Sequence, residues 1–475
     1  MAITRRQFLK RSGVAAGAMA SAGLFTNPLV RRAFAEIDDK YLVVIFLDGG
    51  NDGLNTVVPS GNANYNLRDA YQAARTLGPG GLQLSSGQLA GTSFGTDANT
   101  ATPIALHPGL SGLKYLQTTY NKVAVIQGCG YPDYNLSHEV SRQIWQTGYP
   151  FSPIQNGWVG RHLHDQYTLM QIPAVCVSNS IAPEFRTTGT NVLAISRLSN
   201  FRFPYDRDHN PDNLNKDDAF NLLYGAAEGS AHALSKVVGS VGKSTLLATQ
   251  SYRSLAGDWN SARSDTIKNS YIDSINDYGS GIATRLREVS RMIYGVETGA
   301  TGVDCHFFQL SNGGYDTHSD QGTNGANEQH YGLHRELGDA IKVFYEDMID
   351  LGTESRVCIV VWSEFSRRIE QNDSGTDHGS QGPMFVVGGA VNGGLYGNHP
   401  DIRANSLDDQ GNTNYTQSSD PSDAFVSTDF RDVFGTILLN WVDMDLGDVQ
   451  ALLPTDPFVD PDHYWLTQNF NMGFL

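Results

Sequence analysis

Residues 41–50 read Tyr-Leu-Val-Val-Ile-Phe-Leu-Asp-Gly-Gly, an apolar run that ends in an aspartate and two glycines. A strand buried on one face alternates apolar and polar residues, whereas a strand buried on both faces is apolar throughout. The run therefore predicts a central strand of a parallel sheet, closed by a turn at Gly49 and Gly50. In open sheets of this kind ligands bind at the carboxyl ends of the strands, which is where Asp48 lies.

The rest of the chain alternates between similar apolar runs and helical periods. Apolar residues spaced three and four apart predict a helix that ends near Tyr294, another over 328–351 and a last one over 429–442. This order predicts an α/β fold, a doubly wound and mostly parallel sheet with crossover helices on both faces. The further predicted strands are 122–127, 173–177, 306–310, 356–362 and 384–387.

Two segments do not follow the alternation. Residues near 62–102 and 179–261 are rich in Gly, Ser, Asn and Asp and have no sustained period. We interpret them as loop insertions over the carboxyl-terminal edge of the sheet, within a single domain that spans residues 36–475.

Composition limits the class of protein. The chain has 475 residues, of which 40% are hydrophobic and 17% charged, as in folded chains and unlike disordered ones. The net charge of −17 repels phosphate backbones and anionic lipid surfaces, so nucleic acid is not an expected partner. The four cysteines lie in or beside apolar runs, which favours buried free thiols over an inter-strand disulfide.

Residues 1–35 have the pattern of a twin-arginine signal peptide. Arg5 and Arg6 precede a weakly apolar stretch rich in Ala and Gly, and residues 33–35 (Ala-Phe-Ala) form a cleavage site. Pro28 and several polar residues dilute this stretch too far for the alternative, a membrane anchor. We expect the twin-arginine translocase as a transient partner, a mature bacterial protein that is periplasmic or secreted, and no membrane span in the mature form. Because this route carries folded chains, a buried metal site becomes more plausible.

Polar residues that could bind a cation follow the ends of the predicted strands. Asp316 and His318 are two apart in an extended segment and therefore face the same side. Glu364 ends a strand, where the alternative is a structural ion pair with Arg367. Mixed carboxylate and imidazole ligands suit Zn²⁺, Mn²⁺ or Mg²⁺. The candidate metal ligands are Asp48, Asp52, Asp316, His318, Glu364 and His378.

Two further motifs leave alternatives open. Ser137 opens a predicted helix, either as a plain N-cap or as a nucleophile placed where the helix N-terminus stabilises an anion. His330 and His334 are four apart on a helix, but they lack the glutamate of a metalloprotease motif. We therefore expect these two histidines on a solvated helix face.

The order of these motifs resembles that of the alkaline phosphatase and sulfatase superfamily. Within it, the sequence closely resembles an exported domain-of-unknown-function family, number fifteen-oh-one, from about Tyr41 to Val442. The resemblance is carried by the twin-arginine signal and by Gly49–Thr56, Ser137-His138, Gly314–His318, Ser363–Arg367 and Gly375–Gly379.

The superfamily resemblance implies two metal positions. Asp316, His318 and His378 match the first position. The second position corresponds to Asp48, Glu364 and Ser137, and the candidate catalytic residues are Ser137 and Arg367.

Two departures from the superfamily pattern change the expected metal content. The usual strand-end Asp-His pair appears here as Glu364-Phe365, so the second position loses an imidazole. Asp316 and His318 are also closer together in sequence than their counterparts. We therefore expect one divalent ion (Zn²⁺, Mn²⁺, Mg²⁺ or Ca²⁺) rather than two, with Asp52 replacing or assisting Asp48.

The resemblance implies a metal-dependent hydrolase of phosphate or sulfate esters that acts on a small or glycan-linked ester. The alternative hypothesis is a non-catalytic exported binding or assembly protein on the same fold, and the missing imidazole favours it.

Overall fold

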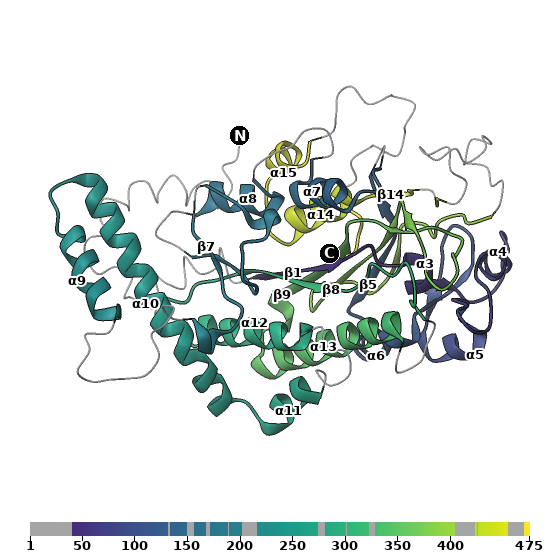
Figure 1. Ribbon diagram of the computed structural model, residues 1–475, viewed down its shortest axis with the longest axis horizontal. Coiled ribbons are helices and arrows are strands. Elements are labelled where there is room, and N and C mark those ends of the chain that lie inside the picture. The colour runs from purple at the N-terminus through teal and green to yellow at the C-terminus, as the bar shows by residue number, and fades with distance from the viewer. Residues whose placement is uncertain are drawn as a thin grey trace.

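The computed structural model describes most of the chain after the predicted signal peptide, whose residues 1–35 lie outside the described part (Figure 1). The described residues are 40–131, 134–149, 156–167, 172–188, 190–201, 216–273, 281–300, 302–322, 328–403, 423–424, 426–454 and 470–475.

One large sheet forms the centre of the molecule, with strand order β13-β5-β12-β9-β1-β8-β6-β7 and β14 beside β5. All neighbouring pairs are parallel except those of β12, which is antiparallel to β5 and β9. The predicted fold class is therefore confirmed. The strands are β1 (Tyr41–Asp48), β5 (Val123–Gly130), β6 (Ala174–Cys176), β7 (Val192–Ala194), β8 (Phe307–Gly313), β9 (Val357–Ser363), β12 (Gly382–Gly388), β13 (Gly394–Tyr396) and β14 (Thr428–Asp429).

The reversed direction of β12 has a simple cause. A parallel neighbour of β9 needs a crossover connection to the other end of the sheet, which is usually a helix. Residues 364–381 instead form a loop with the short ribbon β10 (Ser366–Arg367) and β11 (His378–Gly379), so the chain re-enters the sheet at the edge it left. This loop therefore stays at the carboxyl end of β9.

Helices cover both faces of the sheet, which explains the unbroken apolar run in β1 (Figure 1). Tyr41, Val43 and Ile45 belong to one core with α6 (Ser111–Tyr120), α12 (Ile282–Glu297) and α13 (Gln329–Leu351). Leu42, Val44 and Phe46 belong to the other core, with α7 (His138–Thr147), α8 (Trp158–Gln166), α14 (Phe430–Asn440) and α15 (Leu446–Leu452). All six are at most 3% exposed, and each such side chain contributes about 1.5–3 kcal/mol through burial.

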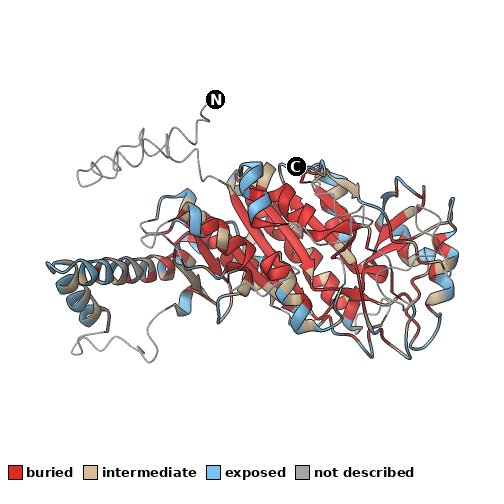
Figure 2. Cartoon of the chain, turned by 90° about the horizontal axis from the view of Figure 1, so that it is seen from above, coloured by how far each residue is buried: buried red, intermediate tan, exposed pale blue. Residues whose placement is uncertain are grey.

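The two predicted insertion segments contain secondary structure of their own. The first holds α4 (Leu67–Ala74), α5 (Ser86–Leu89) and β3 (Ser93–Thr96), and β3 joins β2 (Val57–Pro59) and β4 (Pro103–Leu106) in a small antiparallel sheet. The second includes α9 (Lys216–Glu228) and α10 (Ala233–Ala262), a helical hairpin that projects from the body (Figure 2). Among the described helices, none combines the length and the apolar character needed to span a bilayer.

The burial of the four cysteines agrees with the apolar runs around them. Cys129, Cys176, Cys305 and Cys358 are all buried and free, which confirms the prediction of buried thiols. Burial raises the pKa of Cys176 and of Cys305 to about 12. These thiols therefore stay protonated and unreactive near neutral pH.

His330 and His334 form a buried cluster with His107, so the expectation of a solvated helix face is wrong. Both α13 histidines are fully buried, with ring centroids 4.2 Å apart, and His107 stacks edge-on against each of them. His330 Nε2 lies 3.1 Å from Asn51 Oδ1, and His334 Nε2 lies 2.9 Å from Thr56 Oγ1. This face of α13 thus packs on the turn that follows β1.

The buried histidines should make the protein sensitive to acid. Burial lowers the pKa of His330 to about 4 and moves that of His334 well below its usual value, whereas both titrate near 6.5 in an unfolded chain. The unfolded state therefore takes up protons that the folded state excludes, and stability falls as pH drops from about 6.5 toward 4. Each histidine contributes a slope of up to about 1.4 kcal/mol per pH unit in that window.

Urea unfolding at a series of pH values from 7.5 to 4.5 measures this slope. A His330→Asn/His334→Asn variant should be less stable at neutral pH but should lose less stability on acidification. His164, which is exposed on α8, provides the control, because His164→Asn should leave the slope unchanged. An equal slope in the double variant and in the wild type would contradict the assignment.

Candidate metal centre

The turn after β1 brings the ends of β1, β8 and β9 together. Gly49 and Gly50 have φ values of 124° and 76°, in the left-handed region that favours glycine. A Cβ on Gly49 would lie 2.3 Å from the backbone N of Asp316, so the turn also requires a residue without a side chain. The Gly49 and Gly50 N–H groups donate to Glu364 at 3.1 and 3.2 Å, which joins the turn to the end of β9.

Asp316, His318 and His378 lie side by side at this edge of the sheet. His318 Nε2 is 3.1 Å from Asp316 Oδ1, and His378 Nε2 is 3.4 Å from the same oxygen. The two Nε2 atoms are 2.9 Å apart, although 60 residues separate the histidines in the sequence. Two imidazoles that share one ion, at about 2.0–2.1 Å per bond, keep their nitrogens within about 4 Å, so the arrangement permits a common cation.

A third imidazole, His138, joins the cluster from the first turn of α7. Its Nε2 lies 3.5 Å from Asp316 Oδ1, and the ligand atoms of His138, Asp316 and His378 are all within 4.8 Å of one another. This Nε2 is buried and has no hydrogen-bond partner among the described residues. His138 was not predicted as a ligand from the sequence, although the Ser137-His138 motif at a helix start after a buried strand was a signal for it.

The opposite nitrogen of each imidazole faces an oxygen acceptor. His138 Nδ1 lies 2.9 Å from Glu364 Oε1, His318 Nδ1 lies 3.1 Å from Asp377 Oδ1, and His378 Nδ1 lies 2.7 Å from the Leu136 carbonyl oxygen. A carbonyl or an ionised carboxylate can only accept, so each Nδ1 carries a proton, and in the neutral imidazole the Nε2 atom then has the lone pair. Metal-binding histidines are oriented in this way by acceptors behind them. His138, Asp316 and His378 therefore form a group that could hold a divalent cation, and His318 lies beside two of its members.

Arg367 holds the loops that carry the cluster together. Its Nη2 donates to Asp316 Oδ1 at 2.6 Å and also to the carbonyl oxygens of Tyr315 and Gly49. Its other donors reach the carbonyl oxygens of Gly50 and Thr376. The Arg367 side chain is fully buried and its contacts fit a positioning role, while its predicted catalytic role stays a prediction. Burial would raise the pKa of Asp316, but the hydrogen bond and charge of Arg367 lower it and keep the carboxylate ionised.

Glu364 lies behind the cluster rather than within it. Both carboxylate oxygens accept hydrogen bonds, from Gly49 N, Gly50 N, Ser363 Oγ and His138 Nδ1. Burial alone would raise the pKa of this buried carboxyl, but the hydrogen bond from His138 and the charge of Arg142 lower it. The hydrogen bond to Glu364 in turn raises the pKa of His138. Glu364, predicted as a metal ligand, is placed here as the group that orients His138.

The other predicted ligands also have protein partners. Asp48 Oδ1 accepts from Arg142 Nη2 at 2.5 Å. Asp52 is fully buried in a bidentate pair with Arg75, at 2.8 and 3.1 Å, and also accepts from Gln321 at 2.6 Å. The structure therefore does not support Asp52 as a metal ligand, because its carboxylate belongs to a separate network.

Ser137 occupies the N-cap position of α7, where both interpretations of the sequence place it. Its side chain is exposed and makes no capping hydrogen bond. Ser137 directly precedes His138 in the sequence and is therefore next to a member of the cluster.

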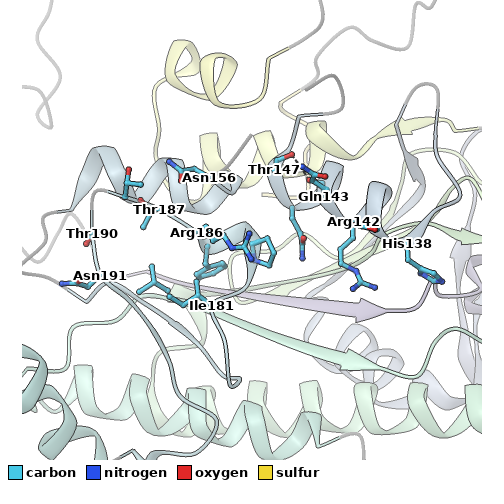
Figure 3. A pocket seen from close by; sticks show the side chains of 16 residues that line it. His138, Arg142, Gln143, Thr147, Asn156, Ile181, Arg186, Thr187, Thr190 and Asn191 are labelled. Carbon is cyan, nitrogen blue, oxygen red and sulfur yellow. Dashed lines mark hydrogen bonds between the residues drawn. The ribbon is translucent and has the colours of Figure 1, made fainter. Parts of the chain in front are cut away.

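A groove lined by polar and apolar side chains begins beside the cluster (Figure 3). Its volume is about 1210 Å³, and His138 and Arg142 form one end of it. The groove continues along α7 and the segment 181–192, where amide and hydroxyl side chains lie beside apolar ones and Arg186 adds a second guanidinium. A ligand that reaches the cluster can thus extend into a cavity suited to hydroxyl-rich or anionic groups.

Fold and site together define an α/β protein with a candidate metal centre of three imidazoles and one carboxylate at the carboxyl edge of its sheet. Residues 274–417 match the model of the family described as Protein of unknown function (DUF1501), which confirms the resemblance over that part of the chain. The matched range includes Asp316, His318, Glu364, Arg367 and His378.

Other comparisons are distant. The chain is similar to a solved structure titled "Structure of alkaline phosphatase from the Antarctic bacterium TAB5", at 10% identity and a TM-score of 0.26. The likeness covers 76% of this chain and 94% of that one. No curated protein sequence matches the chain.

Proposed function

We propose that this protein is an exported, metal-dependent hydrolase of phosphate or sulfate esters. The observation that carries the proposal is the convergence of three imidazole Nε2 atoms on the Asp316 carboxylate, each backed by an oxygen acceptor. In this proposal His138, Asp316, His318 and His378 hold one divalent ion. When bound, such an ion polarises an ester oxygen and stabilises charge that develops in the transition state.

The surrounding residues have roles that follow from their positions. Ser137 is the proposed nucleophile, since the free N–H groups and the dipole of a helix N-terminus stabilise an anion bound there. Arg142 lies at the same end of the groove and offers a permanent positive charge to a phosphate or sulfate group. Arg367 donates a hydrogen bond to Asp316 and so keeps this carboxylate in place. The amide and hydroxyl side chains of the groove support a small or glycan-linked ester as substrate, because sugar hydroxyls pair with such groups.

A substrate screen tests the proposal directly. The mature chain should hydrolyse at least one member of a set of aryl phosphates, phosphodiesters and aryl sulfates when Zn²⁺, Mn²⁺, Mg²⁺ or Ca²⁺ is supplied. A chelator should abolish the activity, and a Ser137→Ala variant should lower the turnover rate while keeping the metal. His164→Ala, on an exposed face of α8, should behave like the wild type. Tight metal binding without turnover of any member would favour the non-catalytic binding protein instead.

A further inference from the structure

Arg142 occupies the place between the two carboxylates that were expected to hold a second metal ion. It lies on α7 four residues after His138, so both side chains project from the same helix face. Its Nη2 is 2.5 Å from Asp48 Oδ1 and 3.5 Å from Glu364 Oε1. The guanidinium also lies over the ring of Phe46, with 5.4 Å between its carbon and the ring centroid.

We propose that Arg142 is a built-in substitute for the second cation, so that the protein binds one divalent ion and uses a guanidinium where a second ion would bind. This inference rests on the proposed function, since it concerns the same site. Asp48 and Glu364 are two acidic groups at one sheet edge, and the single positive charge of Arg142 offsets part of their negative charge without any ion. The Arg142 guanidinium lies at the place beside both carboxylates that an ion would occupy.

Arg142 also explains why this position can lack an imidazole ligand. A guanidinium is charged at every physiological pH and cannot be removed by a chelator, unlike a metal ion. Its planar donors can pair with Asp48 and still face the groove, where Arg142 forms part of the lining. The charge of the second position is thus supplied by the chain itself, at the point where an anionic group would enter.

Removal of Arg142 should open this position to a metal. In Arg142→Ala, Asp48 loses the one hydrogen-bond donor that its side chain has among the described residues, and Glu364 loses a neighbouring positive charge. Two carboxylates are then left at this sheet edge without the guanidinium between them. Mn²⁺ prefers carboxylate oxygens. We therefore expect the variant to bind one more Mn²⁺ per chain than the wild type.

Calorimetric titration of the chelator-stripped mature protein with Mn²⁺ measures this directly. The wild type should bind one ion per chain, Arg142→Ala two, and the double variant Arg142→Ala/Asp48→Asn one again. Arg186→Ala is the matched control, because Arg186 lines the same groove away from both carboxylates, and it should bind one ion. If Arg142→Ala does not fold, as judged by circular dichroism, Arg142→Gln keeps the length of the side chain without its charge and should also gain an ion.

The outcomes separate this inference from the proposed function. Two ions in the wild type, or no gain in either Arg142 variant, would overturn the role of Arg142 and leave a metal-dependent hydrolase intact. A wild type that binds no ion would contradict the proposed function. In that case a single ion gained by Arg142→Ala, and lost again in the double variant, would still support the substitution of a cation by Arg142.

Discussion

Replacement of His138 by alanine should reduce the affinity for a divalent ion at least about 100-fold, and Asp316→Ala, His318→Ala and His378→Ala should do the same. Loss of a group that merely orients a ligand costs 10–100-fold in affinity, so loss of the ligand itself should cost more. The fold should survive, because the four side chains lie at loops and at a helix start above the sheet, and Asp316 and His318 are about half exposed. Metal content after native purification, combined with a thermal melt, measures both effects.

The orienting residues provide graded controls for this experiment. Glu364→Gln and Asp377→Asn weaken the acceptors behind His138 and His318, so each should lower the affinity by about 10–100-fold. His164→Ala should retain full affinity, since this histidine is exposed on α8. His330 and His334 would be poor controls, because both are buried and their replacement disturbs the fold. Unchanged metal content in His138→Ala would remove His138 from the site.

Substitutions in the buried Asp52–Arg75 pair should cause the largest loss of folding stability. Arg75→Ala is expected to lower the free energy of unfolding by about 3–5 kcal/mol, because it leaves the Asp52 carboxylate buried without its counter-charge. Both side chains are fully buried and joined by two hydrogen bonds. Burial would raise the pKa of Asp52, but the charge of Arg75 lowers it, so the carboxylate stays ionised in the folded state. Urea unfolding at pH 7 measures the loss.

A double-mutant cycle shows whether the loss comes from the pair. Arg75→Met/Asp52→Leu replaces both charges with apolar groups and should be more stable than either single variant. The exposed pair of Lys243 and Glu228 provides the comparison, and Lys243→Ala should cost less than about 1 kcal/mol. Strictly additive effects in the buried pair would contradict the proposed coupling.

The Asp52 network also supports the candidate metal centre from a distance. Gln321 donates to Asp52 and accepts from the hydroxyl groups of Thr317 and Thr376. Thr317 lies between Asp316 and His318, and Thr376 is two residues before His378. Loss of the buried pair should therefore loosen two of the segments that present metal ligands, in addition to lowering global stability.

The sheet could be predicted from the sequence because a strand that is buried on both faces is an unbroken run of apolar residues. Each apolar run, such as 41–47 and 356–362, became a buried strand of the main sheet. The same logic placed Asp316 and His318 at one edge, since residues after parallel strands meet there. His378 lies at that edge because the loop that carries it leads into β12, which is antiparallel to β9. The direction of β12 was not predictable in this way, because an apolar run is the same when read from either end.

The sequence by itself determined the fold class, the buried thiols and three residues of the candidate centre. Only the tertiary structure decided the partners of each polar side chain. His138 meets Glu364 across 226 residues, and Arg142 meets Asp48 across 94. Residue type alone did not show that Glu364 orients a histidine, that Asp52 belongs to Arg75, or that His330 and His334 are buried. A strand that is buried on both faces is apolar at each of its positions, so its burial can be read from a short stretch of sequence. A hydrogen bond or ion pair depends on two distant segments that only the folded chain brings together.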